Sequence, residues 1–174
     1  MTKIFKGRTP LALLADGLPV QARIGLVAVA ASLAVDKLKH LPEFPIARAA
    51  FELVQRWYDG ERFDPDQFEE AIAPEDDGRG VDVCATEATS KDAHWAWLAL
   101  ESALFYVAFH AYRTLDQCPG PSVAVIRDVD ALDVLDDQLR EILPGFMKTV
   151  SAAAKYLERQ PEASFARLKA EIDR

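Results

Sequence analysis

The sequence predicts an all-α fold: a single-domain multi-helix bundle around a buried central helix at about residues 91–114. Between residues 93 and 112 only four positions are neither apolar nor aromatic: His94, Glu101, Ser102 and His110. A helix that is apolar on almost every side must be buried on almost every side. The convincing periodicity elsewhere is also helical. A length of 174 residues is most simply one domain, residues 1–174.

Three helices are expected before the central one. Residues 20–40 are rich in Ala, Leu and Val and should be largely buried. A second helix is expected from Pro45 to Tyr58, because one stripe carries Ile46, Ala50, Leu53 and Trp57. Gly60 is expected to stop this helix. Asp64 and Pro65 resemble the N-cap and first position of a short helix that ends before Pro74.

Residues 74–90 hold two glycines and a charge cluster, so we expect a long loop. Val81, Val83 and Cys84 alternate weakly with polar residues, but nothing supplies a partner for a strand there. Thr89 or Ser90 is expected to cap the central helix. The run from Cys118 to Pro121 should end that helix or the segment just after it.

Three more helices are expected towards the C-terminus. The first is a fourth major helix, with charged residues outside and one apolar stripe: Ile126, Val129, Leu132, Leu135, Leu139 and Ile142. Pro144 and Gly145 break the chain. Helices at about 146–159 and 161–172 then follow.

The central stretch is long enough to cross a membrane, but Glu101 at its middle would be costly in lipid. The mean hydropathy of −0.04 also favours a soluble protein. The apolar run Leu11–Leu14 is too short for a secretory signal. Cys84 and Cys118 form neither a metal-ligand spacing nor a disulfide framework, so a cytoplasmic location is expected.

The acidic residues are concentrated in one segment. Residues 59–82 contain ten acids and two bases. The net charge of this segment therefore equals the net charge of the whole chain, −8. Nucleic-acid binding needs a basic surface, and an anionic membrane would repel this one. The charge favours a basic protein partner, or else a solvated loop that only keeps the protein soluble.

Signals for catalysis are weak, and neither an enzyme nor a cofactor is expected. The glycines form no phosphate-binding loop. Cys84 as a nucleophile would need a nearby histidine, which sequence cannot place among His40, His94 and His110. On an ideal helix His94 and Glu101 share a side and His110 points away, which favours a buried polar contact between His94 and Glu101 over a metal site.

The aspartates Asp133, Asp136 and Asp137 share roughly one helix face. They invite comparison with the magnesium-binding motifs of prenyl-transferring enzymes, but such enzymes need two facing motifs and a larger bundle. We expect these residues to form the wet face of their helix, or to extend the acidic surface of residues 59–82.

The order of features resembles the immunity proteins of bacterial polymorphic toxin systems, in particular the all-helical group numbered six among the immunity families. The resemblance covers roughly residues 20–115. It rests on an Ala-rich helix at Ala28–Leu38, the run Ala50–Gly60, the acidic loop with Glu75, Asp76 and Asp77, and the aromatic helix that follows. The residues of the aromatic helix that carry the resemblance are Trp95, Ala96, Trp97, Ala103, Tyr106, Ala108, Ala111 and Tyr112. The C-terminal third matches only in being helical and acidic.

The resemblance implies a non-enzymatic protein that binds and neutralises a cognate toxin of contact-dependent or type VI secretion competition. An acidic patch could occupy the basic cleft of a toxin that attacks nucleic acid. Tyr58 lies off the apolar stripe and is the better anchor, whereas Trp57 belongs to the core. The hypothesis therefore assigns partner binding to Tyr58, Asp64, Asp66, Glu69, Glu70, Glu75, Asp76 and Asp77.

Two alternatives stay open. One is a small helical metal- or ligand-binding enzyme that uses His94, Glu101 and Cys84 around an internal cavity. The other is a helical adaptor protein, in which the acidic loop serves solubility alone.

Overall fold

The computed structural model of the chain describes residues 8–76, 78–120, 123 and 128–174. Within these ranges the protein is all-helical, with nine helices and no strand, which confirms the predicted fold class. The helices are α1 (Pro10–Asp16), α2 (Val20–Leu38), α3 (Phe44–Tyr58), α4 (Asp66–Ile72), α5 (Val81–Glu87), α6 (Lys91–Thr114), α8 (Asp128–Ile142), α9 (Phe146–Arg159) and α10 (Phe165–Ile172).

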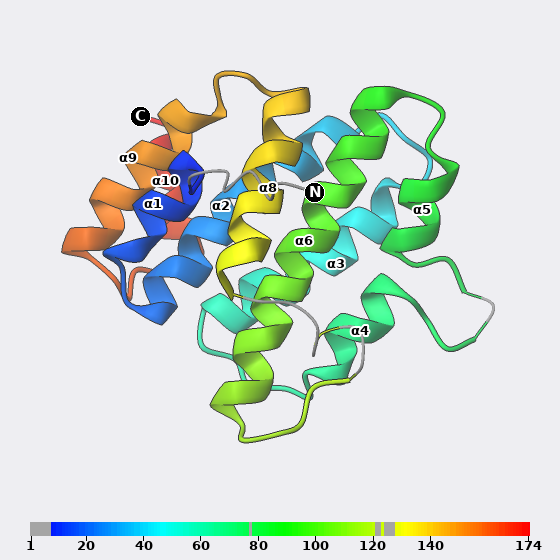
Figure 1. Ribbon diagram of the computed structural model, residues 1–174, viewed down its shortest axis with the longest axis horizontal. Coiled ribbons are helices and arrows are strands. Elements are labelled where there is room, and N and C mark those ends of the chain that lie inside the picture. The colour runs from blue at the N-terminus through cyan, green and yellow to red at the C-terminus, as the bar shows by residue number, and fades with distance from the viewer. Residues whose placement is uncertain (1–7, 77, 121–122, 124–127) are drawn as a thin grey trace, which may run out of the picture.

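Helix α6 is the central helix, as predicted. It runs through the middle of the molecule and packs against α8, α2, α5, α3 and α4 (Figure 1). Its large side chains Trp97, Leu100, Leu104 and Tyr106 are almost completely buried. The expected cap is also present, because the Ser90 side chain accepts a hydrogen bond of 3.1 Å from the Ala93 amide. The amphipathic helices around α6 therefore bury their apolar faces against one shared core.

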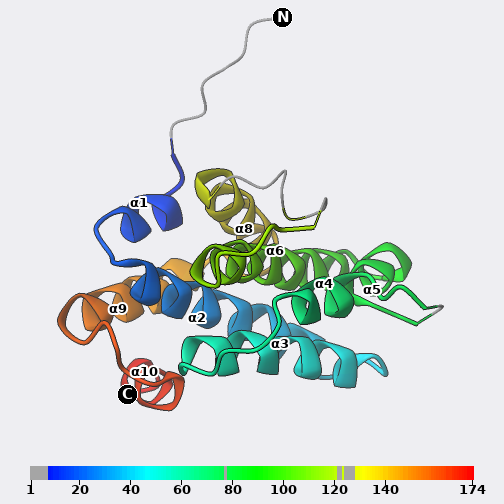
Figure 2. The same ribbon diagram turned by 90° about the horizontal axis from the view of Figure 1, so that it is seen from below.

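The surrounding helices lie on two sides of the pair formed by α2 and α6. Figure 2 shows α1 and α8 on one side of this pair, and α3 and α10 on the other. Helix α9 packs against α2, and α10 packs against both α9 and α2. The described chain thus has its N-terminal helix at the same end as its last two helices (Figure 1).

Helix α1, which the apolar pattern did not indicate, is held by carboxylates of α8. Asp133 Oδ1 accepts hydrogen bonds from the Thr9 amide at 2.9 Å and from the Thr9 hydroxyl at 2.7 Å. Asp136 Oδ2 accepts from the Leu11 amide at 2.9 Å, and its Oδ1 pairs with Arg140. Amides of a first helical turn have no partner within the helix, so these carboxylates act as its caps.

The expectation of a wet face at Asp133, Asp136 and Asp137 is therefore wrong for two of the three residues. Asp136 is fully buried and Asp133 is half-buried, while Asp137 is exposed. Apolar periodicity alone cannot find such residues, because the amides they cap belong to a helix more than 120 residues earlier in the chain.

The predicted long loop at 74–90 contains helix α5, so that prediction is wrong over residues 81–87. Val81, Cys84 and Ala85 are buried and pack on α6. They recur at helical spacing rather than in alternation, which is why the weak strand signal was misleading. A helix of seven residues has too few turns to show a clear period.

The other boundaries agree with prediction to within a few residues. The ends of α3 and α9 are as expected or one residue away, and α2 ends at Leu38. The last helix begins at Phe165 rather than Pro161, where Asp59 Oδ1 accepts a hydrogen bond of 2.7 Å from the Phe165 amide. On α8 the predicted stripe is buried from Leu132 to Ile142. Ile126 and the side chain of Val129 lie outside the described residues.

In the part of the chain that the structure describes, no helix combines the length and the apolar character that a membrane span requires.

Replacing the buried carboxylate of α8 should loosen α1. Asp136→Ala removes the cap of Leu11 and the partner of Arg140, and we expect a loss of about 2 kcal/mol in the free energy of unfolding. Urea denaturation followed by circular dichroism measures this loss. Asp130→Ala, at an exposed position of the same helix, is the control and should change stability by less than about 0.5 kcal/mol. Equal stability of the two variants would contradict the capping role.

Candidate functional site

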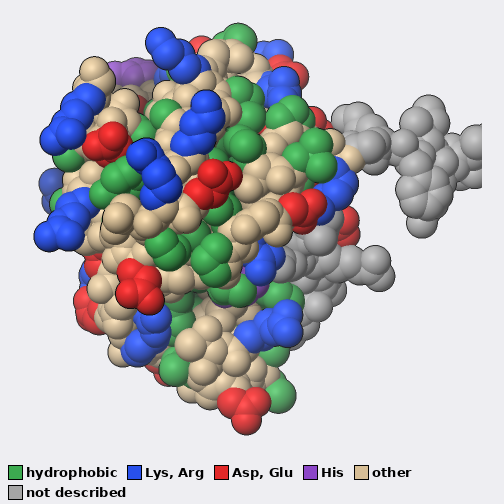
Figure 3. All heavy atoms as spheres, turned by 90° about the vertical axis from the view of Figure 1, so that its left-hand side faces the viewer, with side chains coloured by type: hydrophobic (Ala, Val, Ile, Leu, Met, Phe, Trp, Pro, Cys, Tyr) green, Lys and Arg blue, Asp and Glu red, His purple; other side chains and the backbone are tan. Residues whose placement is uncertain are grey.

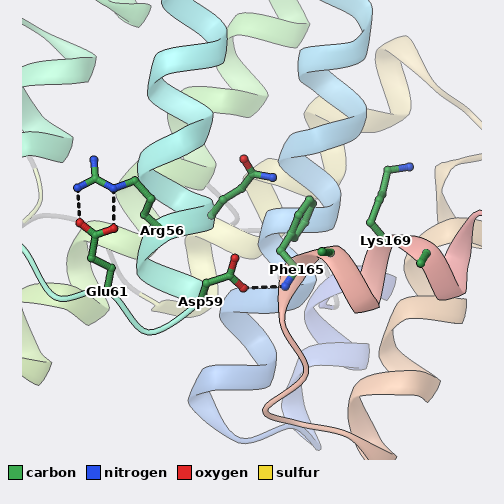
Figure 4. Close-up of a pocket in the computed structure, with 8 residues that line it drawn as sticks. Arg56, Asp59, Glu61, Phe165 and Lys169 are labelled. Atoms are coloured by element: carbon green, nitrogen blue, oxygen red, sulfur yellow. Dashed lines mark hydrogen bonds and ion pairs between the residues drawn. The ribbon is translucent and has the colours of Figure 1, made fainter.

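Several acids between residues 59 and 82 hold the fold together. Asp59 caps α10 through the Phe165 amide, and Glu61 accepts two hydrogen bonds from Arg56. Figure 4 shows these contacts around a hollow between α3 and α10. Neither carboxylate is therefore a free charge offered to a partner.

Asp66 and Glu69, two members of the predicted patch, attach α4 to the end of α6. The hydroxyl of Tyr112, a residue only 2% exposed, lies within hydrogen-bonding distance of Asp66 Oδ1 and of Glu69 Oε1, the latter at 2.6 Å. Glu69 Oε1 also accepts from the Gly120 amide at 3.1 Å. Burial and the two carboxylates raise the pKa of Tyr112 well above its usual range. These two acids therefore have a structural role that the sequence did not indicate.

Four other members of the predicted patch face solvent, as Asp66 also does. We call Asp64, Glu70, Glu75 and Asp76 the acidic patch. All four are exposed, and none forms an ion pair with a described residue. Asp64 Oδ1 accepts a hydrogen bond of 3.2 Å from the Asp66 amide, and Glu70 Oε2 lies 3.5 Å from the Glu75 amide. Asp77 lies outside the described residues.

The expectation that Tyr58 is an exposed anchor is wrong, because its side chain lies in the core and is 3% exposed. Its ring packs against Gly25 of α2, where a Cβ atom would come within 2.7 Å of the ring. The pattern on α3 did not indicate this contact, since it depends on a glycine of another helix. Trp57 is buried as expected, at 1% exposure.

The Tyr58 hydroxyl is buried without a hydrogen-bond partner among the described residues. Burial, followed by the charge of Asp59 and the neighbouring Tyr156, raises the pKa of Tyr58 to about 12. A buried unpaired hydroxyl destabilises a protein by the cost of removing it from water. The Tyr58 side chain therefore contributes packing but no hydrogen bond with a described residue, although the Tyr58 backbone carbonyl accepts a hydrogen bond from Gln21 Nε2.

The three residues of the alternative enzyme reading do not form a ligand set. His94 Nδ1 lies 2.8 Å from the Ala85 carbonyl oxygen, so its observed partner is a backbone group of α5 rather than Glu101. Burial raises the pKa of the Cys84 thiol, which disfavours the thiolate. Burial and the charge of Asp82 raise the pKa of Glu101. Among the residues described, no three His, Cys, Asp or Glu side chains are arranged to hold a metal ion.

The hollow in Figure 4 has a volume of about 610 Å³ and is lined by charged residues that are already paired. Arg56 is bound to Glu61, and Lys169 lies 2.5 Å from Asp173. Asp59 Oδ1 accepts a hydrogen bond from the Phe165 amide at the start of α10. The described residues that line this hollow therefore offer neither a free cation nor an open helix end to an anionic ligand.

The charges outside residues 59–82 sum to zero, but they are separated along the chain. Residues 83–143 contain ten acids and four bases, whereas residues 144–174 contain six bases and four acids. Figure 3 shows Lys and Arg side chains spread over the face that carries α9 and α10, with acids among them. Counting charge by helix rather than over the whole remainder would have shown this separation.

Comparison of the chain with protein-family models, with curated proteins and with solved structures finds no match in any of the three.

Replacing Tyr58 by Phe should separate packing from polarity. At neutral pH we expect the free energy of unfolding of Tyr58→Phe to equal or exceed that of the wild type, within about 1 kcal/mol, because the hydroxyl is unpartnered. Since the folded pKa is raised, the Tyr58 contribution is complete below pH 10 and is lost as the pH rises towards 12. The wild type should therefore lose about 1.4 kcal/mol per pH unit relative to Tyr58→Phe in that window.

Urea denaturation of both proteins between about pH 9 and pH 12 provides the measurement. Parallel stability curves across this range would contradict the raised pKa. A clear loss of stability in Tyr58→Phe at neutral pH would mean that the hydroxyl has a partner.

Proposed function

We propose that this protein is a non-catalytic immunity protein that binds and neutralises a cognate bacterial toxin through an acidic surface, and so protects the cell that makes it. The observation that carries the proposal is the acidic patch. Asp64, Glu70, Glu75 and Asp76 are exposed and form no ion pair with a described residue, while Asp66 and Glu69 of the same segment attach α4 to Tyr112. Such a surface is complementary to a basic protein.

The resemblance to the all-helical immunity family supplies the biological content of the proposal. The features on which the resemblance rests lie, in chain order, in α2, α3, the acidic segment that follows α3, and α6. The proposed partner is a protein toxin with a basic surface, and neither nucleic acid nor a membrane is proposed as a partner. The proposed place of action is the cytoplasm.

Physical chemistry supports an acidic surface for this task. An immunity protein has to capture its toxin before the toxin acts, so association must be fast. Complementary charge raises association rates by long-range attraction and rejects partners of like charge. Glu70 lies on α4, which is attached to α6 through Tyr112, so this member of the patch loses little backbone freedom on binding.

The competing enzyme reading requires His94, Glu101 and Cys84 to act together. Its supporting observation is a smaller hollow of about 250 Å³ that includes Cys84 and Trp97 in its lining. A metal assay of the purified protein, with thermal melting in the presence of Zn²⁺ or Mn²⁺, tests it. A raised melting temperature would indicate binding to the native state and would favour the enzyme over the immunity protein.

The direct test is co-expression with the product of the adjacent gene in the same operon. We expect that product to be toxic alone, and we expect this protein to restore growth and to co-purify with it as a complex. A harmless neighbouring product that forms no complex would contradict the proposal. Growth rescue without a complex would also contradict it, because the proposed mechanism is direct binding.

Charge reversal in the acidic patch should slow capture of the partner. For the double variant Glu75→Lys and Asp76→Lys we expect association to be about tenfold slower at low salt, with a weaker dependence on salt. Surface plasmon resonance at several salt concentrations measures both quantities. The matched control reverses two exposed acids at the end of α9 and just after it, Glu158→Lys and Glu162→Lys. If both double variants have the same association rate, the patch does not steer the partner.

A further inference from the structure

An open groove of about 560 Å³ lies between α3 and α4, next to the acidic patch. Its lining is mainly apolar. Ala49 is exposed, and three other apolar side chains of the lining are half-buried: Ile46, Leu53 and Ala71. Apolar surface that is left open to water in a concave site is a common feature of protein-binding surfaces.

The groove differs from a typical small-molecule site. Such sites enclose most of their ligand and present a few fixed polar groups. Here the polar side chains that line the groove are all exposed: Glu52, Arg56, Glu70 and Arg79. An open apolar groove with a charged rim fits the apolar face of a helix better than it fits a small ligand.

The cations on the rim are already neutralised. Arg56 is bound to Glu61 and lies 4.8 Å from the centre of the Phe63 ring. Arg79 pairs with Glu87 and lies 3.7 Å from Glu43. Neither arginine is therefore free to attract an acidic partner.

The carboxylates on the rim are less well balanced. Glu52 has one exposed ion pair of 3.8 Å with Arg48, and such pairs contribute little. Glu70, on the α4 side, has no ion pair with a described residue and contacts the Glu75 amide at 3.5 Å. The rim of the groove thus continues directly into the acidic patch, and its net unbalanced charge is negative.

We infer that this groove docks a basic amphipathic helix of the partner protein. Apolar side chains of that helix fill the space over Ile46, Ala49 and Leu53, and its Lys or Arg side chains meet Glu52, Glu70 and the acidic patch. The inference rests on the proposed function and adds to it the class of segment that binds. It assigns the apolar contact area to the groove, a role first expected of Tyr58.

The test uses a synthetic helical peptide with leucines on one face and lysines on the other, labelled for fluorescence anisotropy. We expect it to bind the wild-type protein, with NMR shifts of backbone amides concentrated on α3 and α4. A peptide with glutamates in place of the lysines should not bind. Binding of both peptides alike, or NMR shifts concentrated on other helices, would overturn the inference.

Filling the groove provides the variant. Ala49→Trp places a large side chain over the groove at an exposed position, and we expect it to weaken peptide binding by about tenfold or more. Ala152→Trp adds the same side chain at an exposed position of α9 and should leave binding unchanged. Circular dichroism and urea denaturation check that both variants are folded. Equal binding by the two variants would overturn the inference, and Ala49→Arg, which fills the groove with a cation, provides an independent second variant.

The same variants in the co-expression test separate this inference from the proposed function. Rescue by the wild type and by Ala152→Trp, but not by Ala49→Trp, supports both. Rescue by all three proteins overturns the groove as the docking site and leaves the immunity function standing. A wild-type protein that neither rescues nor forms a complex overturns the proposed function, while the peptide experiment still decides whether the groove binds a basic helix.

Discussion

Trp97 and Tyr106 of α6 point to opposite sides of that helix, roughly 180° apart on an ideal helix, and both are about 1% exposed. Water must therefore be excluded from most of the surface of α6, while one stripe that includes His94, Glu101 and Phe109 stays half-buried. This requirement determines the arrangement of the other helices. Alanines close to these aromatic residues along the helix, including Ala96, Ala99 and Ala103, are completely buried and allow neighbouring helices to approach closely. The core consequently contains most of the aromatic side chains of the described residues.

Carboxylates have a second structural role that the total charge conceals. Asp59 caps α10, Asp136 caps α1, and Asp66 with Glu69 binds Tyr112. In each case an acid on one helix or turn satisfies a donor from a distant part of the chain. The short helices need this help, because seven or eight residues provide few internal hydrogen bonds. A part of the acidic character of this protein is thus required by its fold.

The sequence predicted the long helices well because each has several turns and a clear apolar stripe, or is apolar throughout. It failed at α1 and α5, which are too short to show a period and are stabilised by contacts with α8 and α6. Within the candidate site, exposure was predicted correctly for Glu75 and Asp76 but not for Tyr58. The burial of Tyr58 depends on the space that Gly25 leaves on a different helix, which no local pattern records.

Charge and apolar contact area have different effects on binding, and both are needed for capture of a partner. Exposed acids such as Glu75 and Asp76 act at a distance, so they mainly affect the rate of association and contribute little to the lifetime of a complex. A long lifetime requires buried contacts, usually through a few anchoring side chains that enter an apolar site. With Tyr58 inside the core, the open apolar surface next to the acidic patch is the groove at Ala49 and Leu53. A partner that is attracted by the patch and held by the groove must carry basic and apolar residues close together, and an amphipathic basic helix meets this requirement.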